Sequence, residues 1–225
     1  TMLGLVMVLS ATSISQFHKG NSPWRLFNRQ LLWAVLGVIG LWFAMRVPTR
    51  RWRRLVNPAL AASCGLMLLP FVPGIGARVN DASAWVAIGP INFQPSEFLK
   101  LAVLLASANL LAKRHDEMHD LGRTLGPVLA IAFVGAALCM LQSDLGSAIV
   151  LAAIVVAVAF IAGAPLLPMT AAGTMGAVGA LAFVVSSPRR EARFTAFMDI
   201  AAHKDHLSYQ TYQAMIAMAQ GGITG

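Results

Sequence analysis

The chain has 225 residues, of which 57% are hydrophobic and only 12% charged, and its formal net charge is +8. Soluble domains carry about 25% charged residues because water covers their surface, so this composition excludes a single soluble core. It also excludes intrinsic disorder, a collagen repeat, a disulfide scaffold and a coiled coil. We expect an all-α, polytopic transmembrane helix bundle with no nucleic-acid partner, since the positive charge must be judged by its place relative to the bilayer.

Seven apolar runs separated by polar segments predict seven spans, because roughly 20 apolar residues cross the hydrocarbon. The predicted spans are 1–15, 28–47, 56–75, 97–112, 125–141, 147–162 and 169–187. The fifth and sixth runs form a nearly continuous apolar stretch, from Leu125 to Ala162, that is twice the length of one crossing. The chain must therefore reverse at the polar break 142–147. We expect one transmembrane domain over 1–187.

The composition changes at 188–225 to arginine, histidine, lysine, glutamine and tyrosine, which predicts a surface segment. Tyr209 and Tyr212 fall on one helical face and glutamines near the other, while Gly221 and Gly222 supply a helix stop. Tyrosine is typical of headgroup depth. This pattern predicts a long extracytoplasmic loop after the seventh span, with a short amphipathic helix lying in the membrane interface.

Lysine and arginine in short loops predict the orientation, since they mark the cytoplasmic side. Five arginines lie between Arg46 and Arg54, and three more cations lie in 113–123. Alternation then puts 16–27, 74–95, 142–147 and 188–225 outside. Within 188–225, that leaves four cations on the outer side, against the rule: Arg189, Arg190, Arg193 and Lys204. Either the orientation is reversed, or, as we prefer, these cations meet an anionic partner in the headgroup layer.

The strongest local signal for chemistry lies in residues 85–100. Pro95 opens a helix where its missing N–H costs nothing, and Glu97 in the first turn favours the helix dipole. Lys100 lies one turn further in and is followed by an apolar run, with Glu97 as its obvious partner. An ionisable residue at that depth predicts a function, and a snorkelling lysine is the alternative.

Asp144 is the second candidate, and two roles are open to it. It can cap the sixth helix, as aspartate does well. On the predicted topology it also shares the outer face with Glu97 and Lys100, where a cavity holding a carboxylate, a lysine and nearby arginines suits a pyrophosphate-linked substrate.

Metal and redox sites are not expected. His115 and His119 have helical i, i+4 spacing, but an aspartate stands where a zinc protease needs glutamate. His203 and His206 flank charged residues, so we expect a solvated or interfacial role. The two cysteines, Cys64 and Cys139, lie in separate apolar runs and are expected to be small core residues.

Several motifs together resemble one family. They are Asn80-Asp-Ala-Ser-Ala-Trp85, Gly89-Pro90, Phe93-Gln-Pro-Ser-Glu-Phe-Leu-Lys100, Gln142-Ser-Asp-Leu-Gly-Ser147, Arg193-Phe-Thr-Ala-Phe197 with Asp199, and Tyr209-Gln210 with Gln213 and Gly221-Gly222. In order and spacing they resemble the SEDS family of bacterial shape, elongation, division and sporulation proteins (FtsW, RodA and SpoVE), with a lean to the division type. The resemblance covers essentially the whole chain.

The resemblance implies a multi-pass glycosyltransferase of the bacterial cytoplasmic membrane, with about ten spans. It implies polymerisation of lipid II on the outer face during cell division, with undecaprenyl pyrophosphate leaving. The implied partners are a class B penicillin-binding protein and other membrane proteins of the division or elongation machinery. No cofactor is firmly implied, although a divalent cation at the pyrophosphate would fit this chemistry.

The resemblance also implies site residues. The substrate-cavity candidates are Glu97, Lys100, Asp144, Arg193, Gln210 and Gln213. The motif-supporting residues are Trp85, Gln94, Pro95, Ser96, Gly146, Tyr209, Gly221 and Gly222.

Several departures from the family pattern qualify the resemblance. Asp81 stands where the family usually has glycine, Ala84 where a basic or small polar residue often precedes the tryptophan, and Ile200 where proline is usual. Ser143 stands where the family has proline and Ser147 where it has threonine. The family's essential aspartate and about three further spans are expected beyond Gly225, so the chain resembles the amino-terminal two-thirds of a member and its catalytic base stays unassigned. Two other functions remain open: a flippase for the lipid-linked precursor, and a fragment with only a binding role toward division proteins.

Overall fold

The computed structural model describes residues 2–18, 22, 24–79, 82–89, 91–118, 120–200 and 208–222. The chain forms two compact units, Thr1–Val56 and Asn57–Gly225. In the first unit, α1 (Met2–His18) packs against α2 (Trp24–Arg46). Two residues separate α2 from α3 (Thr49–Leu66), which begins in the first unit and continues into the second. Most of the large apolar side chains of α2 are exposed, as expected for a helix that meets lipid rather than water.

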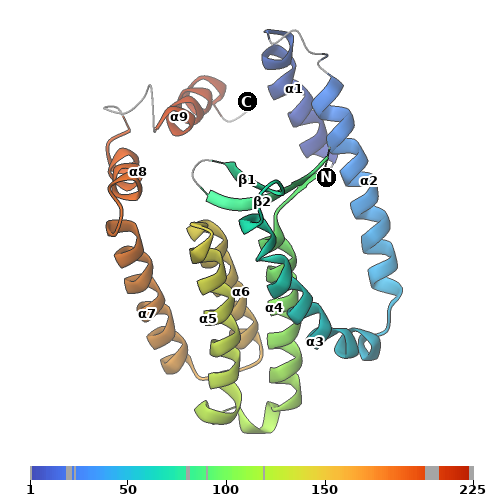
Figure 1. Ribbon diagram of the computed structural model, residues 1–225, viewed down its shortest axis with the longest axis vertical. Coiled ribbons are helices and arrows are strands. Elements are labelled where there is room, and N and C mark those ends of the chain that lie inside the picture. The colour runs from blue at the N-terminus through green and yellow to red at the C-terminus, as the bar shows by residue number, and fades with distance from the viewer. Residues whose placement is uncertain are drawn as a thin grey trace. The chain divides into compact units, whose positions relative to one another are not determined.

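Three helices form the centre of the second unit. They are α4 (Pro95–Lys113), α5 (Gly126–Leu141) and α6 (Leu145–Ile161), and Figure 1 shows them side by side. Their buried apolar side chains, including Leu99, Val103 and Leu151, make one core. Gly135 lets α5 approach α6 closely, because a Cβ there would lie 2.9 Å from Leu151 Cδ1.

A small antiparallel sheet lies at the end of this bundle where α4 begins (Figure 1), and the sequence did not predict it. Its strands are β1 (Gly76–Val79), β2 (Ala82–Ile88) and β3 (Ile91–Phe93), in the order β1-β2-β3. Trp85 pairs with Ala77, and Val86 pairs with both Gly76 and Phe93. Strands this short carry too few alternating positions to stand out beside long apolar helices.

Helix α3 has other limits than the apolar run 56–75, from which the third span was predicted. Helix α3 already begins at Thr49, inside the arginine-rich segment, and it ends at Leu66. A 3-10 turn, η1 (Leu69–Phe71), then leads to β1. The helix stops early because Pro70 cannot donate a helical hydrogen bond and because Gly76 must pass close to Pro70.

The polar segment between α4 and α5 contains a 3-10 turn, η2 (His115–Glu117), and a π-helical turn, η3 (Leu121–Leu125), which Asp120 caps. The remaining helices are α7 (Leu166–Val185), α8 (Pro188–Met198) and α9 (Tyr209–Gly221). Helix α9 occupies the stretch whose tyrosine and glutamine pattern predicts a helix.

Helix α8 was not predicted, and its place in the sequence was assigned to a loop. The guanidinium of Arg190 donates to the Phe183 carbonyl and to Ser186 Oγ, both at 3.1 Å, and it stacks over the Phe183 ring. Arg190 thereby satisfies the carboxyl end of α7 and holds the start of α8 against it.

The structure confirms the all-α class, with the three-stranded sheet as an addition. Among the described residues, five helical segments are long and apolar enough to cross a membrane, and they are Leu26–Arg46, Thr49–Phe71, Pro95–Lys113, Leu121–Leu141 and Leu166–Val185. Two shorter apolar helices cover Met2–Thr12 and Leu145–Ile161. The chain is a polytopic membrane protein, and the exact number and limits of its spans stay a prediction.

Candidate functional site

The amino ends of α4 and α6 meet at one end of the bundle, and two polar residues join them. Gln94 is the N-cap residue of α4 and Asp144 that of α6. The Gln94 amide donates from Nε2 to Asp144 Oδ2 at 2.6 Å, and Asp144 Oδ1 accepts from the Ser147 N–H at 3.0 Å. Both carboxylate oxygens are therefore engaged, so the capping role considered for Asp144 is present in the structure.

Two serines extend this contact into the core. Ser96 Oγ and Ser147 Oγ lie 3.2 Å apart, and Gln94 Nε2 lies 3.5 Å from Ser147 Oγ. Ser96 is fully buried and Ser147 is 7% exposed. We call Gln94, Ser96, Asp144 and Ser147 the inter-helix cluster. It explains why the two predicted motifs contain polar residues at helix starts: the residues satisfy each other where the backbones approach.

The predicted partner of Lys100 is present. Lys100 Nζ lies 2.7 Å from Glu97 Oε1, one turn earlier on α4. The Lys100 side chain is 16% exposed, whereas that of Glu97 is 61% exposed. The lysine stem is thus packed in the bundle, and its charge is carried toward the surface at the end where α4 begins. This arrangement is compatible with snorkelling and with a functional cation.

Sequence reasoning missed the structural role of Gln142. Its side chain is 1% exposed, and its Nε2 donates to the Met67 carbonyl at 2.6 Å. The backbone carbonyl of Gln142 accepts a hydrogen bond from the Ser83 N–H in β2 at 3.1 Å. Gln142 thereby ties the end of α3 and the sheet to the turn between α5 and α6. Its Oε1 is buried and has no hydrogen-bond partner among the described residues. The polar break at 142–147 was the only available signal.

The turn after Gln142 has an unusual backbone. Ser143 has φ +61°, and it is the one non-glycine residue with positive φ in the described part of the chain. Proline, which the family resemblance leads us to expect at this position, is fixed near −65° and cannot adopt this conformation. The departure at Ser143 is therefore matched by a backbone that proline could not form.

The other candidate residues lie away from the inter-helix cluster or are not described. Trp85 is half-buried in β2, and Gly146 lies in the first turn of α6. Tyr209 and the two candidate glutamines of α9, Gln210 and Gln213, are exposed. Neither glutamine makes a hydrogen bond within the described residues.

Several predicted side chains fall outside the description. Arg189 and Arg193 lie on α8, but their side chains are not among those described, and Lys204 lies outside the described residues together with His119, His203 and His206. Gly222 follows α9 with φ +59°, which only glycine adopts readily, so the helix stop has a backbone reason.

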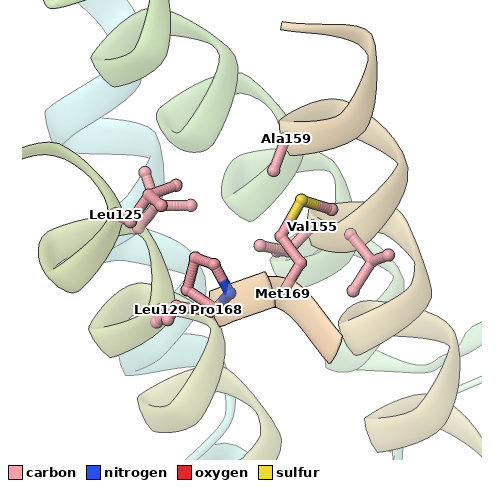
Figure 2. A pocket seen from close by; sticks show the side chains of 8 residues that line it. Leu125, Leu129, Val155, Ala159, Pro168 and Met169 are labelled. Atoms are coloured by element: carbon pink, nitrogen blue, oxygen red, sulfur yellow. The ribbon is translucent and has the colours of Figure 1, made fainter. Parts of the chain in front are cut away.

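No group of three metal-ligating side chains occurs in the part of the chain that the structure describes. An apolar pocket lies between α5, α6 and the start of α7, as Figure 2 shows. It is lined by Leu125, Val128, Leu129, Val155, Val156, Ala159, Pro168 and Met169. It lies toward the carboxyl end of α6, away from Asp144, and its lining offers no polar group to an anionic substrate.

The chemistry available at the sheet end of the bundle is that of binding and positioning. Lys100 supplies a cation, Glu97 an exposed carboxylate, and the inter-helix cluster fixes the two helix starts. The N–H groups at a helix start and a nearby cation together favour an anion. Both oxygens of Asp144 already accept hydrogen bonds, so a substrate could reach them only by sharing or replacing those bonds.

Comparisons with known proteins show to which family the chain is similar. The model of the FtsW/RodA/SpoVE family, described as "Cell cycle protein", matches residues 1–225. "Probable peptidoglycan glycosyltransferase FtsW" of Mycobacterium tuberculosis is 34% identical over 225 residues, which is all of this chain and 43% of the relative. "Stage V sporulation protein E" of Bacillus subtilis is 30% identical over 99% of this chain and 61% of the relative.

Two solved structures are also similar. A mutant of the rod shape determining protein RodA of Thermus thermophilus has a TM-score of 0.58 and 29% identity, covering 82% of this chain and 59% of that one. A structure described as a peptidoglycan synthase complex that coordinates polymerization and crosslinking has a TM-score of 0.64 and 28% identity, covering 96% of this chain and 64% of that one. The chain spans about half the length of its relatives. With a family model matched along its whole length, this multi-pass protein of the bacterial cytoplasmic membrane belongs to the FtsW/RodA/SpoVE family.

Proposed function

We propose that the protein of which this chain is a part is a peptidoglycan glycosyltransferase that polymerises lipid II during cell division. The observation that carries the proposal is family membership along all 225 residues, together with relatives that are named peptidoglycan glycosyltransferase FtsW. We assign the outer face of the membrane to the end of the bundle that carries the sheet, the inter-helix cluster and Lys100. The cation-rich segment between Lys113 and Arg123 is then cytoplasmic.

In the proposed reaction, the C4 hydroxyl of one lipid-linked sugar attacks the anomeric carbon of another. The C4 oxygen forms the new glycosidic bond and gives up its proton to a base, while the bond to undecaprenyl pyrophosphate breaks and the pyrophosphate keeps the electron pair. Lys100 is proposed to stabilise the charge of that pyrophosphate, and the inter-helix cluster to hold α4 and α6 in place. Arg193, Gln210 and Gln213 remain proposed cavity residues. No residue described here is assigned as the base.

A class B penicillin-binding protein is the proposed partner. The support is the similarity to a structure described as coordinating polymerization with crosslinking in one complex. A divalent cation at the pyrophosphate remains a proposal without a ligand group among the described side chains.

The test is polymerisation of purified lipid II by the full-length protein, alone and with its penicillin-binding partner. Glycan strands resolved on a gel are the expected product. No strands from the full-length protein under conditions where another family member is active would refute the proposal.

A flippase for the same lipid is the second candidate, and two polar features inside the helix bundle favour it. Lys100 and Ser107 share one face of α4, and the fully buried Ser107 hydroxyl has no hydrogen-bond partner among the described residues. Charged and polar groups inside a bundle are typical of transport paths. Movement of labelled lipid II across vesicles, with no polymer formed, would favour this candidate over the polymerase.

A further inference from the structure

The excess of positive over negative charge comes from the first part of the chain. Nine of the seventeen lysines and arginines, but none of the nine aspartates and glutamates, precede Asp81. The rest of the chain holds eight cations against nine acidic residues, so the net charge of +8 arises entirely from the first 80 residues. Because the unit Thr1–Val56 contains no carboxylate side chain, its arginines have no acidic side chain to pair with inside that unit.

Five of these cations lie together at the carboxyl end of α2. We call them the arginine cluster: Arg46, Arg50, Arg51, Arg53 and Arg54. All five are exposed. Arg46 is the last residue of an apolar span, and only two residues separate it from the start of α3. The cluster therefore lies where the hydrocarbon ends and the phosphate-bearing headgroup layer begins.

The first turns of α3 have an exposed basic face and an apolar face. Arg50 and Arg54 are four residues apart and share the exposed face. Trp52 and Val56 share the opposite face, where Trp52 Nε1 donates to the Ala44 carbonyl at 3.4 Å and Val56 is 4% exposed. The tryptophan thus fixes the helix start against the end of α2, and the arginines are presented outward.

Two further features point to an anion at this surface. No acidic residue lies in the first turn of α3. The partial positive charge at the amino end of the helix repels the arginines there, and a nearby anion would reduce that repulsion. Arg46 stacks over Trp42 with its Cζ 4.2 Å from the ring centroid, an arrangement that leaves the guanidinium edge available to a phosphate. Trp42 and Trp52 are the aromatic residues expected at headgroup depth.

We propose that the arginine cluster is a binding site for the phosphodiester headgroups of anionic phospholipids in the leaflet that contains it. Arginine binds phosphate oxygens in bidentate fashion, and the membrane supplies them at the depth where the cluster lies. An acidic protein would have to reach the same depth and compete with those lipids. The inference is independent of the polymerase proposal.

The test begins with the unaltered full chain purified in detergent. Native mass spectrometry would count bound lipid after addition of phosphatidylglycerol or, at equal concentration, phosphatidylcholine. We expect the anionic lipid to be retained at least fivefold more, and this preference to fall as salt is raised. Equal retention of the two lipids would overturn the proposal without any variant being needed.

Paired variants then locate the site. At about fivefold for each cation, R50Q/R54Q should bind phosphatidylglycerol about twenty-five-fold more weakly. The matched control is K113Q/R114Q, whose cations share a surface hollow with Asp116 and Glu117 and should lose less than threefold. R50K/R54K keeps the charge that orients the protein in the membrane, and it should retain binding within about fivefold. An equal loss in both glutamine pairs, or no loss in R50Q/R54Q, would contradict a site at the arginine cluster.

Discussion

The side-chain amide of Gln94 donates to Asp144 Oδ2 at 2.6 Å, joining the N-cap residues of two helices that are fifty residues apart in sequence. Asp144 Oδ1 caps α6 through the Ser147 N–H. One carboxylate thus determines how α6 starts and how closely α4 lies beside it. Any effect of Asp144 on substrate must be separated from this structural role.

Asp144→Ala should lower the free energy of unfolding by about 1–2 kcal/mol, because it removes an N-cap and the acceptor for Gln94. Asp144→Asn should keep most of that stability, since asparagine also caps helices and Gln94 can turn its amide to accept from it. Thermal unfolding in detergent measures both variants. We expect the full-length protein to lose polymerisation in both if the negative charge serves the substrate. Normal polymerisation by the stable Asp144→Asn variant would show that Asp144 serves only as a helix cap.

Lys100→Ala in the full-length protein should impair function and preserve membrane insertion, and Lys100→Met should do the same while keeping the packed stem. Stability should change by less than about 1 kcal/mol, because Glu97 is largely exposed and its carboxylate remains hydrated. Polymerisation should fall at least tenfold. Lys113→Met, at the other end of α4, is the matched control. Normal cell growth with Lys100→Met would support the snorkelling interpretation.

Ser143→Gly should stabilise the α5–α6 turn by about 1 kcal/mol, since glycine adopts φ +61° without the penalty that a Cβ imposes. Ser143→Pro would introduce the residue expected from the family motif, yet it should destabilise this chain because its φ is fixed near −65°. The melting temperatures of the two variants test the turn. A higher melting temperature for Ser143→Pro than for Ser143→Gly would contradict the backbone described here.

Gly76→Ala should destabilise the second unit by about 1–3 kcal/mol. A Cβ at this position would lie 2.0 Å from the carbonyl oxygen of Pro70, so the backbone itself has to move. The matched control is Gly173→Ala in α7, where a Cβ meets nothing within 4 Å and helix propensity favours alanine. Denaturant or thermal unfolding should separate the two variants. Equal stability of both would show that Gly76 is free of this contact.

Hydropathy predicted the helical class and the central helices well, because a bilayer requires long apolar segments with satisfied backbones. The partner of Lys100 could also be predicted, since it lies one turn away on the same helix. The contacts that could not be predicted join distant segments. Gln142 and Met67 are 75 residues apart, and no local pattern indicates that one binds the other.

Helix α8 escaped prediction for a different reason. Its arginines have the composition of a solvated loop, and the fact that Arg190 satisfies the end of α7 depends on three-dimensional proximity. The arginines of 46–54 carried a similar signal and were assigned to a loop, although α3 begins at Thr49. Charge alone does not distinguish a loop from the exposed face of a helix.

The hydrogen bond from Gln142 to the Met67 carbonyl also has a consequence for biosynthesis. Ribosomes add roughly 5–20 residues per second, so the donor follows its acceptor by about 4–15 s across those 75 residues. During that interval the end of α3 must find another donor, such as water at the membrane surface. The turn between α5 and α6 would then complete the hydrogen bonding of the earlier helix α3. Slower translation between Met67 and Gln142 would lengthen the time that the end of α3 spends without this hydrogen bond.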